Sequence, residues 1–194
     1  MNISELLNSS AGQDIINNVS TQFGLNQQEA ASAVNAAIPM IVGGLGKNAQ
    51  TEEGAQGIEQ ALSQKPDGSI LNNVNGFFNL GSDAQKDGAG ILGHIFGNKL
   101  PQVESGVSQK SGISISKIGP IVAMLAPIVM GYLGKEKKTN TTASSGGGIT
   151  DILSNITGGG SGAGGGLIGM VTGFLDKDGD GDFMDDIMGM FGKK

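Results

Sequence analysis

A stretch of 29 residues occurs twice in the chain. Residues 19–47 and 107–135 align without a gap at a constant offset of 88 residues. They are identical at nine positions, Val19/Val107, Ser20/Ser108, Gly24/Gly112, Val34/Val122, Pro39/Pro127, Gly43/Gly131, Leu45/Leu133, Gly46/Gly134 and Lys47/Lys135. Most of these are glycine, proline or apolar residues, which determine backbone shape and core faces. The pattern predicts an internal duplication whose copies pack against each other or against the helices between them.

Each copy has the signals of a helix, a tight turn and a second, broken helix. In the first copy Gly24 is placed to end a helix, and Asn26 with Glu29 forms a capping-box pattern for the next one. Pro39 either kinks that second helix or starts a new one at its first turn, and we favour a new helix. Gly46 is expected to end the unit.

The second copy repeats this plan at the equivalent positions. Gly112 is the expected stop, Ser114 or Ser116 the cap, Pro127 the break and Gly134 the end. Residues 52–62, 70–78 and 89–96 are expected to form helices between the copies, with a turn at 87–90. Because no stretch alternates like a strand, we predict an all-α fold with one helical domain over residues 1–137.

Glycine is concentrated in the C-terminal part of the chain. Of 35 glycines, 16 lie between Gly146 and Gly192, which predicts flexible linkers over residues 138–166. Between two glycine-rich runs, the segment 149–156 carries Ile149, Ile152, Leu153 and Ile156 at helical spacing. This segment is expected to be a tethered apolar anchor that docks in a groove. Residues 167–194 are expected to form two amphipathic helices around an acidic loop.

The acidic loop, DKDGDGDFMDDI over residues 176–187, follows the pattern of a helix–calcium loop–helix motif. Asp176, Asp178 and Asp180 occupy positions 1, 3 and 5 of the calcium-binding loop, and Gly181 occupies the turning position 6. Asp182, at position 7, would supply its backbone carbonyl. Hard oxygen ligands at this spacing can converge on one cation, which offsets the repulsion among the carboxylates.

The loop departs from the pattern at its last ligand. Position 12, normally a bidentate glutamate, is Ile187, and the nearest substitutes are Asp186 and Asp185. This departure favours a shortened loop with weak affinity, or a site completed by water or another segment. The alternative is a solvated acidic turn, because Asp-Gly pairs are good turn formers.

Charge and composition limit the classes of partner. The net charge is −6, and removing the six acids between Asp176 and Asp186 leaves a neutral remainder (−6 + 6 = 0), so no basic face is expected and nucleic-acid binding is disfavoured. The longest uncharged apolar run, 118–133, is short for a bilayer span and contains Pro120 and Pro127. We expect a buried core helix there, with membrane association as the alternative.

No catalytic signature is recognisable. His94 is the only histidine, and no nucleophile or acid partner is arranged around it in the sequence. The string Gly43-Gly44-Leu45-Gly46-Lys47 lacks the spacing of a phosphate-binding loop and ends a predicted helix. We therefore expect that the chain is not an enzyme.

The segment DGAGILGHIFGNK, followed by VSQKSGISISKIGPIVAMLAPIVMGYLGK, resembles the bacterial domain-of-unknown-function family 937, which includes the YidB-like proteins. The ending FLDKDGDGDFMDDIMGMFG is similar to the acidic-glycine ending of many members. The resemblance spans most of residues 1–137 and this ending. It implies a small all-helical bacterial fold with no assigned activity.

These observations lead to one functional expectation. We expect a non-enzymatic helical module that binds calcium through its tail and interacts with a protein partner or with itself. The oligomeric state is left open. The N-terminus lacks a basic segment followed by an apolar run, which favours a cytoplasmic location, whereas a weak calcium site would suit the envelope or the outside of the cell.

Overall fold

The computed structural model describes residues 3–64, 68–141, 149 and 152–153. Most of these residues lie in helices and none of them lies in a strand, so the all-α prediction is confirmed. The elements in chain order are α1 Ile3–Asn8, α2 Ser10–Phe23, α3 Gln27–Asn48, α4 Glu52–Gln64, α5 Ser69–Asn72, α6 Val74–Phe78, α7 Ser82–Phe96, the 3₁₀ turn η1 Gly97–Lys99, α8 Leu100–Ser111 and α9 Ile115–Thr141.

The junction between α2 and α3 is built as its sequence predicts. Gly24 ends α2 in the left-handed region (φ 59°), and its N–H donates to the Ser20 carbonyl. Asn26 then starts α3 with a complete capping box: its side chain accepts from the Glu29 N–H, and the Glu29 carboxylate accepts from the Asn26 N–H. These bonds satisfy backbone donors that the first helical turn would otherwise leave unpaired.

The junction between α8 and α9 has the same construction. Gly112 ends α8 in the left-handed region (φ 73°), and α9 begins directly after Ser114. The Ser108 hydroxyl donates to the Ile113 carbonyl at 2.5 Å, as the Ser20 hydroxyl donates to the Leu25 carbonyl at 2.7 Å. The two segments therefore share a helix–glycine–helix outline. Their origin as two copies of one unit stays a prediction.

The prediction that the second helix of each segment is broken is wrong. α3 runs without interruption through Pro39, and α9 runs through Pro120 and Pro127. Gly46 and Gly134, the expected ends, also lie inside these helices. A proline in a helix interior costs roughly 3 kcal/mol. Burial of apolar side chains along the rest of each helix outweighs that cost, since most side chains around Pro39 and Pro127 are in the core.

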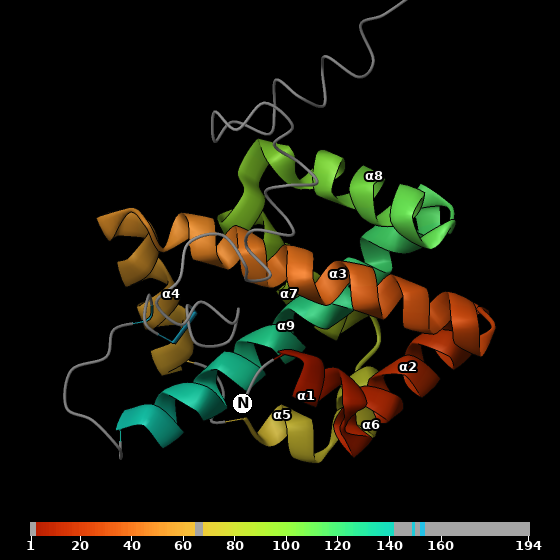
Figure 1. Ribbon diagram of the computed structural model, residues 1–194, viewed down its shortest axis with the longest axis horizontal. Helices are drawn as coiled ribbons and strands as arrows, with labels where there is room; N and C mark the ends of the chain where they lie inside the picture. Colours follow the sequence, from red (N-terminus) through yellow and green to blue (C-terminus); the bar gives the residue numbers. More distant parts are fainter. Residues whose placement is uncertain (1–2, 65–67, 142–148, 150–151, 154–194) are drawn as a thin grey trace, which may run out of the picture.

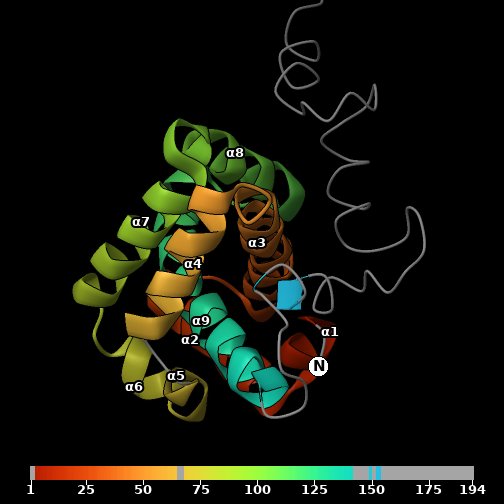
Figure 2. The same cartoon turned by 90° about the vertical axis from the view of Figure 1, so that its left-hand side faces the viewer.

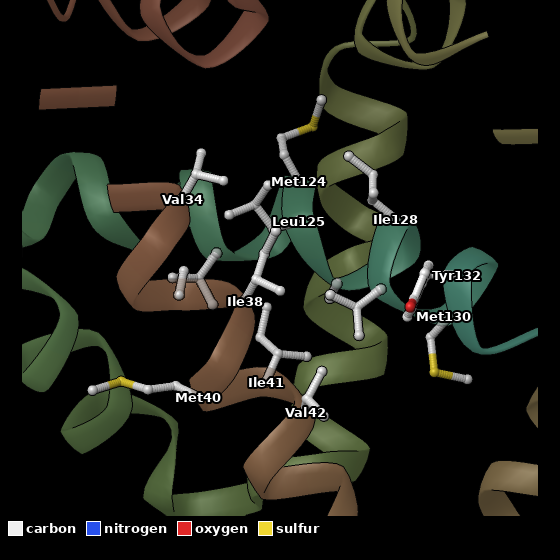
Figure 3. Close-up of a cluster of buried hydrophobic side chains, with 14 of the residues drawn as sticks. Val34, Ile38, Met40, Ile41, Val42, Met124, Leu125, Ile128, Met130 and Tyr132 are labelled. Atoms are coloured by element: carbon white, nitrogen blue, oxygen red, sulfur yellow. The ribbon is translucent and has the colours of Figure 1, made fainter. Parts of the chain in front are cut away.

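α9 is the central element of the fold. It contacts α2, α3, α4, α5, α7 and α8, and the other helices lie around it (Figures 1 and 2). Figure 3 shows part of the buried cluster where α3 packs on α9, with side chains such as Ile38 and Leu125 pointing toward each other. The labelled side chains come from α3 (Val34, Ile38, Met40, Ile41, Val42) and from α9 (Met124, Leu125, Ile128, Met130, Tyr132).

The length of α9 bears on the membrane alternative. Within the described part of the chain, Ile115–Thr139 is long and apolar enough to cross a bilayer by length and composition. In the structure 72% of its most apolar window is buried inside the domain. A helix that is apolar on all sides is accounted for by such a central position.

The segments between the two matched stretches differ from prediction in detail. The predicted helix at 52–62 is present as α4, but the one at 70–78 is divided at Asn73 into α5 and α6. Asn73 has φ −145° and ψ 61°, and its side chain accepts from the Gly76 N–H to cap α6. The turn expected at 87–90 is wrong, because these residues lie inside α7, which begins at Ser82.

Candidate functional site

A hollow of about 400 Å³ lies between α7, α8 and α9. We call it the α7–α8–α9 hollow. Its lining residues are Ser82, Gln85, Lys86, Ala89 and Leu92 from α7, Leu100 and Glu104 from α8, and Gly119, Pro120 and Ala123 from α9. Its lining is therefore mostly small and apolar, with a few polar groups.

Small side chains at the contact of α7 with α9 make room for the hollow. Gly119 and Ala123 are four residues apart and therefore share one face of α9, while Ala89 faces the hollow from α7. None of the three projects beyond a methyl group. Leu92 and Leu100 supply larger apolar surface at the wall. The arrangement suits a slender apolar group.

Glu104 is the acidic group of the hollow. A Cβ atom on Gly119 would come 3.2 Å from Glu104 Oε1, so the carboxylate lies directly over the glycine backbone of α9. Within the described residues, no hydrogen-bond donor or cation pairs with this carboxylate. Burial raises the pKa of Glu104 because it disfavours the charged form. A ligand that brings a cation or a donor here would offset that desolvation.

Lys86 stands at the rim of the hollow and is exposed. Its Nζ lies 3.5 Å from Asp83 Oδ1, three residues earlier on α7. The side chains of both residues are largely in solvent, at 77% and 82% exposure, so this pair contributes little stability. Lys86 and Glu104 thus place a cation at the rim of the hollow and a carboxylate in its wall.

Sequence reasoning did not single out Glu104, although one signal was available. In α8 the partly or fully buried apolar residues are Leu100, Val103 and Val107, at spacings of three and four. Glu104 lies four residues after Leu100, so it is on the same inward face. An acid on the apolar face of an amphipathic helix indicates a special environment.

The predicted apolar anchor has described residues at three of its positions. Ile149, Ile152 and Leu153 are each 2% exposed and belong to the same buried cluster as the helical domain. Figure 2 shows the short blue segment on the side of the helical domain where α1, α3 and α9 lie. Ile156, the fourth apolar residue, lies outside the described residues. The chain beyond α9 thus returns to the domain.

Tyr132 is a second unusual polar group. It is 2% exposed, and its hydroxyl has no hydrogen-bond partner in the described structure. Burial raises the pKa of Tyr132, and the nearby carboxylates of Glu136 and Glu5 raise it further. Glu136 itself is buried at 7% exposure on the same helix. These groups lie in the C-terminal half of α9 and on α1, away from the hollow.

The predicted metal ligands lie outside the described residues. These are Asp176, Asp178, Asp180, Asp182 and Asp186, together with the rest of the acidic loop. Among the residues that the structure does describe, no group of three or more His, Cys, Asp or Glu side chains is placed to hold a metal ion. The calcium site therefore stays a prediction from the sequence.

The other residues considered from the sequence have helical positions. His94 is exposed in the last turn of α7, and its backbone carbonyl accepts from Asn48 Nδ2 at 3.3 Å. The glycine-rich string ending in Lys47 forms the last turns of α3. A Cβ on Gly44 would come 2.1 Å from a ring carbon of Phe96, so this glycine permits close packing of α3 on the end of α7.

Comparison with known proteins gives a family and no further relative. A family model described as a bacterial protein of unknown function, DUF937, matches residues 5–136. No curated protein and no solved structure matches the chain. The matched range covers most of α1, all of α2 to α8 and most of α9. It thus includes the α7–α8–α9 hollow.

Proposed function

Because the chain belongs to this DUF937 family of bacterial proteins of unknown function, we propose a role built on its own residues. The protein is a non-enzymatic helical interaction module: its domain docks short apolar protein segments, and its C-terminal tail binds calcium. One observation carries the docking role, namely the burial of Ile149, Ile152 and Leu153 in the core cluster of the domain.

The position of these three residues in the sequence gives the observation its weight. They lie between two runs rich in glycine, serine and threonine, which have little apolar surface of their own to bury. Three apolar side chains in a polar setting are nevertheless buried. Full burial of such a side chain contributes roughly 1.5–3 kcal/mol. The domain therefore presents a surface on which a short apolar segment can dock.

The calcium role rests on the acidic loop. Asp176, Asp178 and Asp180 supply carboxylates at alternate positions, and Gly181 permits the turn that follows. A calcium ion would offset the repulsion among these carboxylates. Asp186 stands one residue before the usual last ligand, so the affinity is expected to be low.

The helical domain itself is proposed to be a duplicated unit. The support is the matched pair of left-handed glycines, Gly24 and Gly112, and the matched bonds of the Ser20 and Ser108 hydroxyls. The uninterrupted helices α3 and α9 would be the equivalent long helices of the two units. Lys117 links them further, since its Nζ donates to the Phe23 carbonyl at 3.0 Å and to the Gly24 carbonyl at 3.3 Å.

Two measurements test the proposed role. Calorimetric titration of the full chain is expected to show calcium binding with a Kd between about 10⁻⁶ and 10⁻³ M, tighter than magnesium under the same conditions. Light scattering with and without calcium then shows whether the partner is a second copy. No heat with excess calcium would end the calcium role. A strict monomer in both conditions would rule out self-association and leave another protein as the partner.

A further inference from the structure

The α7–α8–α9 hollow has two features that indicate the chemistry of a ligand that would bind there. Its lining is largely apolar, with Leu92, Leu100, Ala89 and Ala123 among the contributing side chains. Its wall carries the Glu104 carboxylate, which has no partner in the described part of the chain. An occupant with an apolar group next to a cation would cover the first feature and pair with the second.

The end of this same chain has that chemistry. The last seven residues are MGMFGKK, in which Met190 and Phe191 are followed by Lys193 and Lys194. Methionine and phenylalanine fill irregular apolar hollows well. The two lysines and Lys177 are the only cationic side chains after Lys138. Lys177 lies inside the acidic loop, so only Lys193 and Lys194 combine a positive charge with neighbouring apolar residues.

The chain is long enough to bring its end to the hollow. Leu153 is buried on the domain, so the remaining 41 residues start from the domain surface. A helical domain of this size is on the order of 40 Å across. The 14 residues from Leu153 to Leu167 alone can span up to about 45 Å, and 20 more precede Met188. The chain after Leu153 is therefore long enough for residues 188–194 to contact any face of the domain.

We infer that residues 188–194 dock in the α7–α8–α9 hollow of their own chain, with Met190 and Phe191 on its apolar lining and the Lys193–Lys194 pair beside Glu104. This inference rests on the proposed docking role of the domain but does not depend on calcium. Intramolecular docking is favoured over docking between copies because the linker keeps the local concentration high, in the millimolar range for flexible tethers.

Carbodiimide cross-linking of the full chain tests this placement, since it joins a carboxylate to an amine only when the two are in contact. The chain is mixed in equal amounts with a ¹⁵N-labelled copy at micromolar concentration, and the whole cross-linked mixture, monomer and dimer, is digested for mass spectrometry. We expect a link from Glu104 to Lys193 or Lys194 between peptides of the same label. Glu104→Gln should abolish this link, whereas Glu53→Gln, at an exposed carboxylate of α4, should leave it.

Hydrogen exchange provides a second readout that does not depend on Glu104. Phe191→Ser in the full chain is expected to speed amide exchange over residues 82–104 several-fold, and Phe174→Ser, the same change elsewhere in the tail, to leave it unchanged. Absence of the Glu104 link, a link joining differently labelled peptides, or equal exchange in both variants would each overturn the inference. If the inference failed but the amides of residues 149 and 152–153 were still protected from exchange, the proposed docking role of the domain would stand.

Discussion

Gly88 on α7 lies directly against the main-chain carbonyl of Ala123 on α9. A Cβ atom at residue 88 would come 1.7 Å from that oxygen and 3.1 Å from Pro127 Cδ. Pro127 has no N–H, so the Ala123 carbonyl, four residues earlier, lacks its usual helical donor. The missing side chain of Gly88 lets α7 approach this carbonyl closely enough for weak Cα–H···O contact.

Replacement of Gly88 by alanine is therefore expected to destabilise the domain. Alanine favours a helix by up to about 1 kcal/mol over glycine, but overpacking against backbone costs typically about 1–3 kcal/mol. Since the helix gain offsets part of the overpacking cost, we expect Gly88→Ala to lower the free energy of unfolding by up to about 2 kcal/mol in urea denaturation followed by circular dichroism.

Gly90, two residues further along α7, is the matched control. A Cβ there would meet nothing within 4 Å, so only the helix propensity should change. Gly90→Ala is expected to raise the free energy of unfolding by up to about 1 kcal/mol. Equal effects of the two substitutions would show that the close approach of α7 to α9 does not constrain residue 88.

The prolines show which part of the fold could be predicted from the sequence. Local signals at Gly24 and at Asn26 with Glu29 predicted the first junction correctly, because capping depends on a few adjacent residues. The local reading of Pro39 and Pro127 failed, because the course of these helices depends on burial by distant segments. Each proline leaves the carbonyl four residues earlier without its usual helical N–H donor. For Pro39 this is the carbonyl of Asn35, an exposed residue, whereas for Pro127 it is the carbonyl of Ala123, which α7 covers.

The candidate site was less predictable than the fold. The hollow arises where α7, α8 and α9 meet, and their mutual placement cannot be read from helical periodicity. The string at 87–90 even predicted a turn, since its two glycines are turn formers in isolation. Gly88 is instead required by contact with a helix 35 residues away in sequence (123 − 88 = 35). The burial of Ile149, Ile152 and Leu153, by contrast, agrees with their apolar spacing within a glycine-rich stretch of sequence.

Tyr132 offers a test of an unpaired buried hydroxyl. Tyr132→Phe removes an oxygen that has no hydrogen-bond partner in the described structure. Burying such a group costs roughly 1–3 kcal/mol, so we expect the free energy of unfolding to rise by about 1 kcal/mol at pH 7. Because burial raises the pKa of Tyr132, the native tyrosine should lose stability as the pH rises above about 10, and the phenylalanine variant should not.

Both parts of this prediction are read from urea titrations at neutral and alkaline pH. Phenylalanine keeps the ring, so the packing of the core is preserved. A loss of stability on Tyr132→Phe at pH 7 would mean that the hydroxyl has a stabilising partner.

Glu104 should make stability depend on pH in a defined direction. Its folded-state pKa is raised by burial, so the folded state binds its proton more tightly than the unfolded state does. Stability from this group is present below the unfolded-state pKa and is lost as the pH rises through the folded-state pKa. The test is made in a chain carrying Lys193→Ser and Lys194→Ser, which removes the proposed tail cations. In that chain Glu104→Gln should raise the stability of the folded domain at pH 7 and leave it unchanged at pH 3.

The expected gain is small, at most about 0.5 kcal/mol, because Glu104 is only partly buried. Differential scanning calorimetry at the two pH values measures it, with Glu53→Gln as the control for removing a carboxylate from an exposed site. With the native tail present, pairing with lysine should shrink or reverse the gain at pH 7. A gain that is the same at both pH values would show that burial of the charge is not its cause.

Detachment of the apolar anchor tests whether its three buried residues hold it to the domain. Ile152→Asp places a charge where the native side chain is 2% exposed, and it should release the segment. Amide exchange at 149 and 152–153 is expected to reach the rate of an unfolded peptide. The free energy of global unfolding should fall by less than the 2–5 kcal/mol typical of a core isoleucine, because the segment can leave by itself.

Ile115→Asp is the matched control for the anchor. Ile115 is 51% exposed in the first turn of α9, so the same substitution should change neither exchange at the anchor nor global stability by more than about 0.5 kcal/mol. A cooperative loss of the whole domain on Ile152→Asp would instead make the segment an integral part of the core.

Variants of the acidic loop distinguish a coordinated calcium ion from a solvated acidic turn. Asp178→Ala and Asp180→Ala each remove a side-chain ligand, and each should weaken calcium binding at least about tenfold in calorimetry. Asp182→Ala should weaken it less, because position 7 binds through its backbone carbonyl, which alanine retains. Glu53→Ala, an equal charge change on α4, should leave the affinity unchanged. A coordinated site must distinguish side-chain ligands from a backbone ligand. If all three alanine substitutions in the loop lowered the affinity for calcium equally and only slightly, calcium would be attracted only by the summed negative charge of the loop.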